Sequence, residues 1–214
     1  MKNKSLHDLG SIALLVVDIQ NDFCDDDGEF AHLGLDVHPA QAIVPRLESF
    51  IAAARMHGLP VIFSKQIESK SVSPPNLRAQ FKAGKLNGVC APGSWGSELY
   101  TLKPLGHEHV LEKYTYDVFS NPMLEKILRK HKIKTLIVTG VNTDICIDTT
   151  IRSAFTHGYH IVVPRDLIAT MNKAGERFYL NIFDMFFGVV TDARSVLEYL
   201  RNIKKEQNTS TKKN

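Results

Sequence analysis

The chain has 214 residues, of which 43% are hydrophobic and 23% are charged, and its formal net charge is +3. This length suits one large domain with a full core, and the small charge without a basic stripe argues against nucleic acid as a partner. The sequence has no apolar run long enough to span a bilayer, and its N-terminus is polar. We therefore expect a cytoplasmic protein that does not enter a membrane. Its three cysteines show no metal-ligand spacing and form no even disulfide set.

The first half of the chain predicts two strands around a helix. Residues 12–17 form a continuous apolar run, typical of a strand buried on both faces, which stops at Asp18. Residues 39–57 carry apolar side chains at helical spacing, and residues 60–63 predict a second strand. Residues 65–106 are rich in Ser, Pro and Gly and contain the only tryptophan, Trp95. We expect an irregular loop there, with a functional or interface role.

The second half continues this alternation. Strands are predicted at residues 109–112, 135–139, 159–163 and 188–190, and helices at 144–157, 174–187 and 193–203, with a further helix opening at Asn121-Pro122. Strands that alternate with helices imply an α/β fold, in which helices cover both faces of a parallel sheet. We predict one domain over residues 1–203 and a polar, disordered tail over residues 204–214.

Polar residues follow the predicted strands at the edge where such sheets bind ligands. They are Asp18, then Lys65 and Gln66, then Lys113, and finally Cys146. Cys146 is expected in the first turn of a helix that follows a strand, where backbone N–H groups and the helix dipole converge. We expect this setting to lower the pKa of the thiol and make it a nucleophile. The alternative is a small core residue, the commoner fate of a free cysteine.

Three of these residues form a set that can attack a carbonyl. Cys146 supplies the nucleophile, Asp18 takes the thiol proton and returns it to a leaving amine, and Lys113 stabilises the negative charges. The N–H groups of the turn at Val141 and Asn142, and of Cys146, are candidates for binding the oxyanion. Taken singly, an aspartate in a turn and a surface lysine are ordinary features.

Three separated motifs, in order, resemble the isochorismatase-like cysteine hydrolases. Residues 13–24 (ALLVVDIQNDFC) resemble the first signature of this family, residues 139–150 (TGVNTDICIDTT) resemble its nucleophile signature, and residues 154–166 continue the pattern. The resemblance implies a Rossmann-like, three-layer α/β/α fold with a six-stranded parallel sheet. It also implies an Asp18–Lys113–Cys146 triad, a cis peptide between Val141 and Asn142, and a homo-oligomer, either a dimer or a tetramer.

Two further segments bear on the substrate. Residues 63–69 (FSKQIES) lack the Asp-x-His motif that builds the metal site of nicotinamidases, so we expect no catalytic metal and no cofactor. Residues 93–99 (GSWGSEL) and 113–122 (KYTYDVFSNP) resemble the subgroup that hydrolyses ureido compounds such as ureidoacrylate and biuret. In the second segment Thr115 stands in place of the usual Arg and Asp117 in place of the usual Ser. Candidate substrate contacts are Phe23, Gln66, Trp95 and Tyr116. Trp95 equally fits a loop anchor or a subunit contact.

The leading hypothesis is a metal-independent cysteine hydrolase that cleaves a C–N bond in a small amide, ureido or carbamoyl substrate through a thioester. One alternative is vinyl-ether hydrolysis of isochorismate, an anionic ring for which Lys65, Lys70 or Arg78 would supply charge. Another is a non-catalytic binding module in which Cys146 is a sensor thiol. The aromatic-rich stretch 178–187 is a candidate oligomer interface, although it equally fits a plain core.

Overall fold

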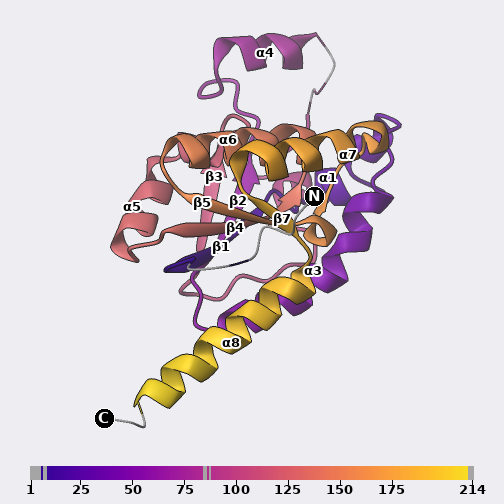
Figure 1. Cartoon of the computed structure of the whole chain (residues 1–214). Coiled ribbons are helices and arrows are strands. Elements are labelled where there is room, and N and C mark those ends of the chain that lie inside the picture. The colour runs from indigo at the N-terminus through magenta and orange to yellow at the C-terminus, as the bar shows by residue number, and fades with distance from the viewer. Residues whose placement is uncertain (1–5, 7–8, 84–85, 87, 212–214) are drawn as a thin grey trace.

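The computed structural model describes residues 6, 9–83, 86 and 88–211. Its centre is a parallel sheet of seven strands, which run in the order β3-β2-β1-β4-β5-β7, with β6 paired to β4 beside that path (Figure 1). The strands are β1 (Ile12–Val17), β2 (Val61–Gln66), β3 (His109–Lys113), β4 (Thr135–Val141), β5 (His160–Pro164), β6 (Ile168–Ala169) and β7 (Val189–Thr191).

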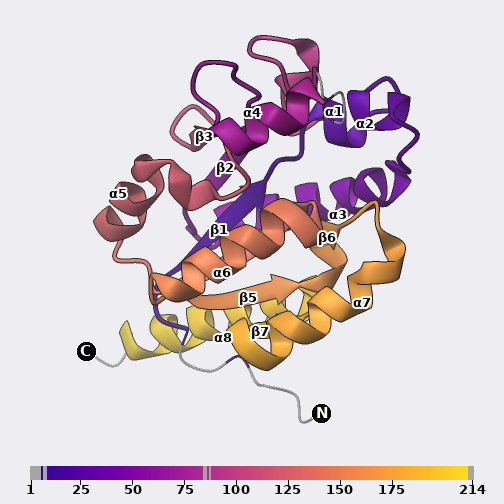
Figure 2. The same ribbon diagram turned by 90° about the horizontal axis from the view of Figure 1, so that it is seen from above.

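Helices cover both faces of the sheet, so the fold is three-layered as predicted. One face packs against α3 and α8, and the other packs against α5, α6 and α7, as Figures 1 and 2 show. The α-helices are α1 (Asn21–Cys24), α2 (Glu29–His32), α3 (His38–Met56), α4 (Pro75–Lys82), α5 (Pro122–Lys130), α6 (Asp148–Thr156), α7 (Lys173–Ile182) and α8 (Ala193–Thr211). In the described part of the chain, no helix is both long and apolar enough to cross a membrane.

Strand β1 explains why two cores form. All six of its side chains are buried, and they alternate between the faces: Leu14 and Val16 point to the α3 side, whereas Leu15 and Val17 point to the α6 side. A strand buried on both faces reads as a continuous apolar run, which is the pattern of residues 12–17. The position and type of β1 are therefore confirmed.

The parallel register brings the strand ends to one edge of the sheet. Val17 pairs with Gly140 of β4 and with Ser64 of β2, and Gln66 of β2 pairs with Lys113 of β3. Gly140 has a φ of +112°, and a Cβ built on it would lie 2.0 Å from the carbonyl oxygen of Val17. Only glycine allows the two strands to approach so closely just before the segment that carries Cys146.

Several predicted boundaries were wrong. The sheet has a seventh strand, β6, which is only two residues long and therefore leaves little periodic signal. Strand β2 continues through Lys65 and Gln66, which were assigned to the loop, because a buried strand end can be polar where side chains find partners. The region 65–106 also contains α4, which projects from the layered body (Figure 1).

The C-terminal region also differs from the prediction. Helix α8 continues to Thr211, whereas the sequence placed the helix end at residue 203 and a disordered tail from 204. Lys, Glu and Gln dominate residues 204–207, and these residues have high helix propensity, so their polarity does not end the helix. The predicted helix over 174–187 is divided into α7 and a π-helical turn, η5 (Phe183–Phe187).

Candidate active site

Asp18, Lys113 and Cys146 lie together at the carboxyl ends of β1, β3 and β4: Lys113 is the last residue of β3, and the other two follow their strands. Lys113 Nζ is 2.7 Å from Asp18 Oδ2 and donates to Cys146 Sγ over 3.4 Å. The Asp18 and Lys113 side chains have no exposed surface, and Cys146 is only 4% exposed. The Lys113 ammonium therefore contacts both the Asp18 carboxylate and the Cys146 thiol. Because the site is buried, its dielectric constant is low and charges interact strongly there.

Asp18 is held in place from two sides. Its backbone has a φ of 52°, an uncommon left-handed conformation that turns the chain sharply at the end of β1. Its Oδ1 accepts a hydrogen bond of 2.7 Å from Ser64 Oγ of β2, while Oδ2 faces Lys113. Each carboxylate oxygen thus has its own partner, and the orientation of the carboxylate is fixed.

The Cys146 segment starts with a non-proline cis peptide bond between Val141 and Asn142, as the family resemblance implied. A π-helical turn, η3 (Thr143–Ile147), follows and leads directly into α6. The carbonyl of Asn142 accepts hydrogen bonds from the N–H groups of Ile145 and Ile147, 3.1 Å each. The predicted strand–turn–helix setting of Cys146 is therefore present, with a wider first turn than an α-helix.

Burial reverses the expected effect of this setting on the thiol. It raises the pKa of Cys146 well above its ordinary value, and the positive charge of Lys113 opposes this shift only in part, while the charge of Asp18 adds to it. The prediction of a lowered pKa was wrong because it counted the helix terminus and not the loss of water. The resting nucleophile is thus a neutral thiol that needs a base.

Lys113 remains an ammonium. Burial lowers its pKa, but the interactions with the nearby Asp18 carboxylate and with Cys146 outweigh burial and raise the pKa above the ordinary value. Its other partners are Gln66 Oε1 at 2.8 Å and the carbonyl of Thr115 at 3.1 Å. Lys113 Nζ therefore has four neighbours for its three hydrogens, which leaves it little freedom to turn.

The four predicted substrate contacts lie in different environments. Gln66 is buried beside Lys113, and Tyr116 is half-buried; burial raises the pKa of Tyr116, with nearby Cys146 adding to the shift and Lys113 opposing it. Trp95 is 53% exposed, so it does not anchor its loop on the core. Phe23 is buried and packs edge-on against Phe30, with ring centroids 4.7 Å apart.

The two departures from the subgroup pattern have structural roles of their own. Thr115 contributes its backbone carbonyl to Lys113, a contact that does not depend on the type of side chain. Asp117 accepts a hydrogen bond of 2.8 Å from the N–H of Phe119 and caps the short helix η2 (Val118–Ser120). An Asp at this position suits a helix N-terminus.

Four buried polar atoms around this site form no hydrogen bond among the described residues, and one of them, Asp18 Oδ2, lies in the ion pair with Lys113. The other three are Gln66 Nε2, Asn142 Oδ1 and Thr143 Oγ1. Gln66 and Asn142 are 6% and 4% exposed, and Thr143 has no exposed surface. Because unsatisfied buried polar groups are costly and therefore uncommon, these three atoms are candidate contacts for a polar ligand.

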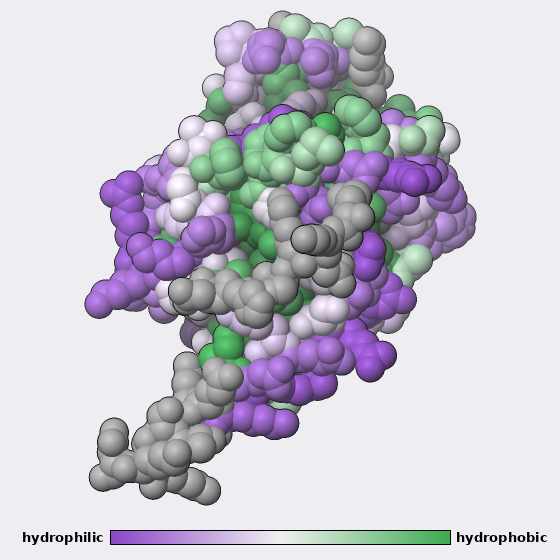
Figure 3. Space-filling view, viewed as in Figure 1, coloured by the Kyte–Doolittle hydropathy of each residue, from purple (hydrophilic) through white to green (hydrophobic). Residues whose placement is uncertain are grey.

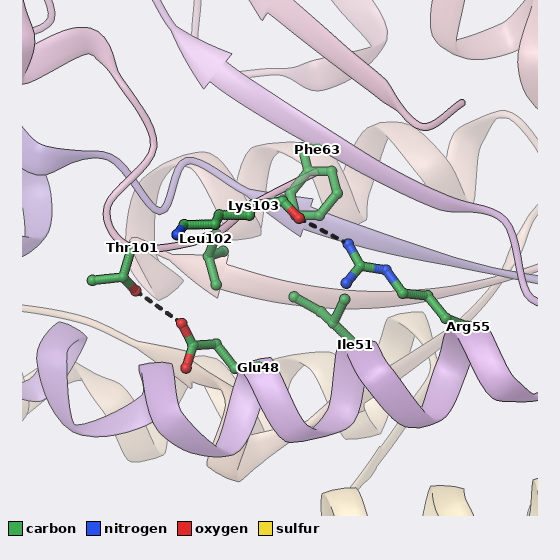
Figure 4. Close-up of a pocket in the computed structure, with 7 residues that line it drawn as sticks. All are labelled: Glu48, Ile51, Arg55, Phe63, Thr101, Leu102 and Lys103. Carbon is green, nitrogen blue, oxygen red and sulfur yellow. Dashed lines mark hydrogen bonds between the residues drawn. The ribbon is translucent and has the colours of Figure 1, made fainter. Parts of the chain in front are cut away.

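A separate hollow lies on the face of the sheet that α3 covers, between α3 and residues 101–103 (Figure 4). Its volume is roughly 360 Å³. Glu48 accepts a hydrogen bond from Thr101, and Arg55 donates to the carbonyl of Lys103, so the two charged residues that α3 contributes to the hollow already have partners. None of the predicted site residues lines this hollow. Within the described ranges, no group of three or more His, Cys, Asp or Glu side chains is arranged to hold a metal ion.

Sequence reasoning missed two side chains that shape the site. Ser64 bonds to Asp18, and Gln20 bonds to the backbone of Gln66 in both directions. Gln20 and Ser64 each come directly after apolar residues of a strand or strand end. A polar residue next to such a run is a sign that its side chain is buried and has a partner. A further acidic residue near this site, Asp22, is 4% exposed and accepts hydrogen bonds from the N–H groups of Glu29 and Cys90.

Comparisons with known proteins show which sequences and folds this chain resembles. The model of the isochorismatase domain matches residues 12–195. The ureidoacrylate amidohydrolase RutB of Cronobacter sakazakii is 31% identical over 207 residues, which cover 88% of each chain. A cysteine hydrolase from Pseudomonas syringae pv. phaseolicola shares the fold with a TM-score of 0.82 and 23% identity, over 94% of this chain and 99% of that chain. The N-carbamoylsarcosine amidase of Thermoplasma acidophilum has a TM-score of 0.71 and 26% identity, over 86% of this chain and 97% of that chain.

Proposed function

The chain belongs to the isochorismatase family, and from that premise we propose that it is a metal-independent cysteine hydrolase that cleaves a C–N bond in a small amide, ureido or carbamoyl compound. The observation that carries the proposal is the position of the Lys113 ammonium, 2.7 Å from the Asp18 carboxylate and 3.4 Å from Cys146 Sγ. A nucleophile, a proton acceptor and a cation converge at the ligand-binding edge of the sheet. The names of the ureidoacrylate amidohydrolase and the N-carbamoylsarcosine amidase support the substrate class.

In the first half of the reaction, Asp18 takes the proton of the Cys146 thiol as sulfur attacks the carbonyl carbon. The neutral thiol of the resting site makes this general base necessary. The carbonyl oxygen becomes an oxyanion, which the N–H groups of Asn142 and Cys146 bind. The C–N bond then breaks, Asp18 gives its proton to the leaving nitrogen, and a thioester remains on Cys146.

In the second half, water attacks the thioester and gives a proton to Asp18. The C–S bond breaks, the acid product leaves, and the proton returns to sulfur. Lys113 keeps its positive charge throughout and stabilises the negative charge, whether this is on Asp18 or on Cys146. Two chemical steps with moderate energy barriers thereby replace one hydrolysis with a high barrier.

The unpartnered polar atoms support a planar substrate with hydrogen-bond donors and acceptors on the same group. Gln66 Nε2 offers a donor to a carbonyl or carboxylate oxygen, and Asn142 Oδ1 offers an acceptor to an N–H group. A ureido or carbamoyl group carries both. Tyr116 and Trp95 are further proposed contacts, and Phe23 is proposed as the apolar wall.

The direct test is ammonia release from a panel of ureidoacrylate, biuret, N-carbamoylsarcosine, nicotinamide and allantoate, without added metal. Cys146→Ala is the control, because it removes the nucleophile and leaves a small apolar side chain in the core. We expect release from a ureido or carbamoyl compound and none from the variant, with an unchanged circular dichroism spectrum. Substantial turnover by the Cys146→Ala enzyme would refute the mechanism. If no compound of the panel releases ammonia, the protein would next be tested for hydrolysis of isochorismate. Labelling of Cys146 without any turnover would favour a thiol sensor.

We also propose a homo-oligomer. Large apolar side chains gather on the surface over α6 and α7 (Figure 3). Phe155, Phe178, Met185 and Phe186 are 49%, 63%, 63% and 58% exposed. Contiguous exposed apolar side chains of this size are typical of a protein–protein contact. They lie on the stretch 178–187 named from the sequence and on the neighbouring helix α6, and a second copy of this chain is the proposed partner.

A further inference from the structure

Gln20 ties three segments of the chain together through one side-chain amide. It lies two residues beyond Asp18 and has no exposed surface. Its Nε2 donates to the carbonyl of Gln66 and to the carbonyl of Ser97, 2.9 Å each, and its Oε1 accepts from the N–H of Gln66 at 2.7 Å. Nε2 also lies 3.4 Å from Cys90 Sγ. Both hydrogens and the oxygen of this amide are therefore in use.

The first consequence concerns Lys113. Because one amide bonds both backbone groups of Gln66, the end of β2 is fixed where it leaves the sheet. The Gln66 side chain starts from this fixed backbone and presents Oε1 to Lys113 Nζ at 2.8 Å. Lys113 Nζ is in turn the group that contacts Asp18 and Cys146. Gln20 thus acts on the ammonium through Gln66 and touches neither the thiol nor the ammonium itself.

The second consequence concerns the segment 90–97, which carries Trp95. Gln20 holds its end through the carbonyl of Ser97, and the next residue, Asn21, donates to the carbonyl of Trp95 at 2.7 Å. The Asp22 carboxylate accepts from the N–H of Cys90 at the start of the segment. The stretch that continues from Asp18 therefore fixes the segment at three points.

We propose that Gln20 is a positioning residue, which sets the Lys113 ammonium and the segment 90–97 in one fixed relation to Cys146. The base, the cation and the Trp95 segment then form a single rigid unit, and the loss of the amide disturbs all three at once. Only the turnover readout of this proposal rests on the proposed function, because thiol alkylation reports on Cys146 without any substrate.

The test compares Gln20→Met, which keeps the length of the side chain and removes its hydrogen bonds, with Thr135→Val. Thr135 is fully buried at the opposite end of β4 and donates to the carbonyl of Leu9, so its variant also loses a buried hydrogen bond. The rate of Cys146 alkylation by iodoacetamide is measured against pH in both variants, together with kcat and KM on a substrate found by the panel. Cys24→Ala and Cys90→Ala are introduced in every protein, so that only Cys146 reacts.

The ionisable groups around the Cys146 thiol are Lys113 on β3, Asp18 after β1 and Tyr116 after β3, together with Cys90, which is an alanine in every test protein. Gln20→Met leaves all of them in place but releases the backbone of Gln66, whose side chain contacts the ammonium, so we expect the pH dependence of alkylation to shift. We expect kcat to fall by about ten- to a hundredfold, the usual effect of a misplaced catalytic group, with a smaller change in KM. Thr135→Val should lose stability and keep the parent pH profile and kcat.

A Gln20→Met protein with the parent alkylation profile would overturn the proposal, whether or not a substrate is known. So would an equal shift in Thr135→Val, because the effect would then be one of stability alone. If Gln20→Met does not fold, Gln20→Asn replaces it. The shorter amide cannot reach Gln66 and Ser97 together, so the same shift in profile is expected, and an unchanged profile refutes the proposal.

Discussion

The buried ion pair between Lys113 and Asp18 makes a strong prediction about stability. In Lys113→Met, the Asp18 carboxylate keeps its buried position but loses a cation that lay 2.7 Å away. At that distance Coulomb's law gives an attraction of about 6 kcal/mol for an effective dielectric constant of about 20. Desolvation offsets much of this attraction, and the measured cost of removing one partner from a buried pair is about 3–5 kcal/mol. We expect the free energy of unfolding to fall by that amount.

The assay is urea unfolding followed by circular dichroism, applied to Lys113→Met, to Asp18→Asn and to the double variant. The double variant should be more stable than either single variant, because it leaves no unpaired charge inside the protein. Arg194→Met is the control: Arg194 and Glu198 form an exposed pair on α8, and its removal should change stability little. If the losses of the two single variants simply add in the double variant, the reasoning about the buried pair is wrong.

Three further predictions follow from the site and the surface. Alkylation of Cys146 should accelerate by about tenfold per pH unit up to pH 9.0, the ordinary thiol value, because burial raises the pKa of this thiol above it; a plateau near neutral pH would contradict that direction. In urea unfolding, Gly96→Ala should lower the free energy of unfolding by about 1–3 kcal/mol, since the new Cβ would lie 2.1 Å from an Asp22 carboxylate oxygen. The control Gly106→Ala places its Cβ where no atom lies within 4 Å, so its free energy of unfolding should stay nearly unchanged. Phe178→Glu should shift the protein towards the monomer in analytical ultracentrifugation, and an unchanged assembly would exclude this residue from the contact.

The fold was predictable because its central strands carry simple patterns. The apolar run of residues 12–17 and its sharp end at Asp18 correspond directly to β1 and the turn after it. The parallel arrangement then fixes the common edge at which Asp18, Lys113 and Cys146 meet. Their position on one edge could be anticipated from the parallel arrangement of the strands, and the family resemblance implied that these three residues form the triad.

What the sequence did not predict depends on three-dimensional packing. The pKa of Cys146 depends on how completely water is excluded, and this is a property of the assembled layers. The bonds of Gln20 join residues 46 and 77 positions apart, so no local pattern indicates them. Helix α4 lies in a polar segment with little apolar periodicity, which is why the segment was expected to be irregular.

The position of Lys113 on β3 has a consequence for how activity is lost. β3 is the last strand at one side of the sheet and has a single neighbour, β2, yet it carries the cation of the site. Outer strands detach in local opening reactions that need less free energy than global unfolding. We therefore expect activity to disappear at denaturant concentrations where the helices remain intact, and amide hydrogens of β3 to exchange before those of β1 and β4. Turnover in this enzyme would then serve as a probe of fraying at one margin of the sheet.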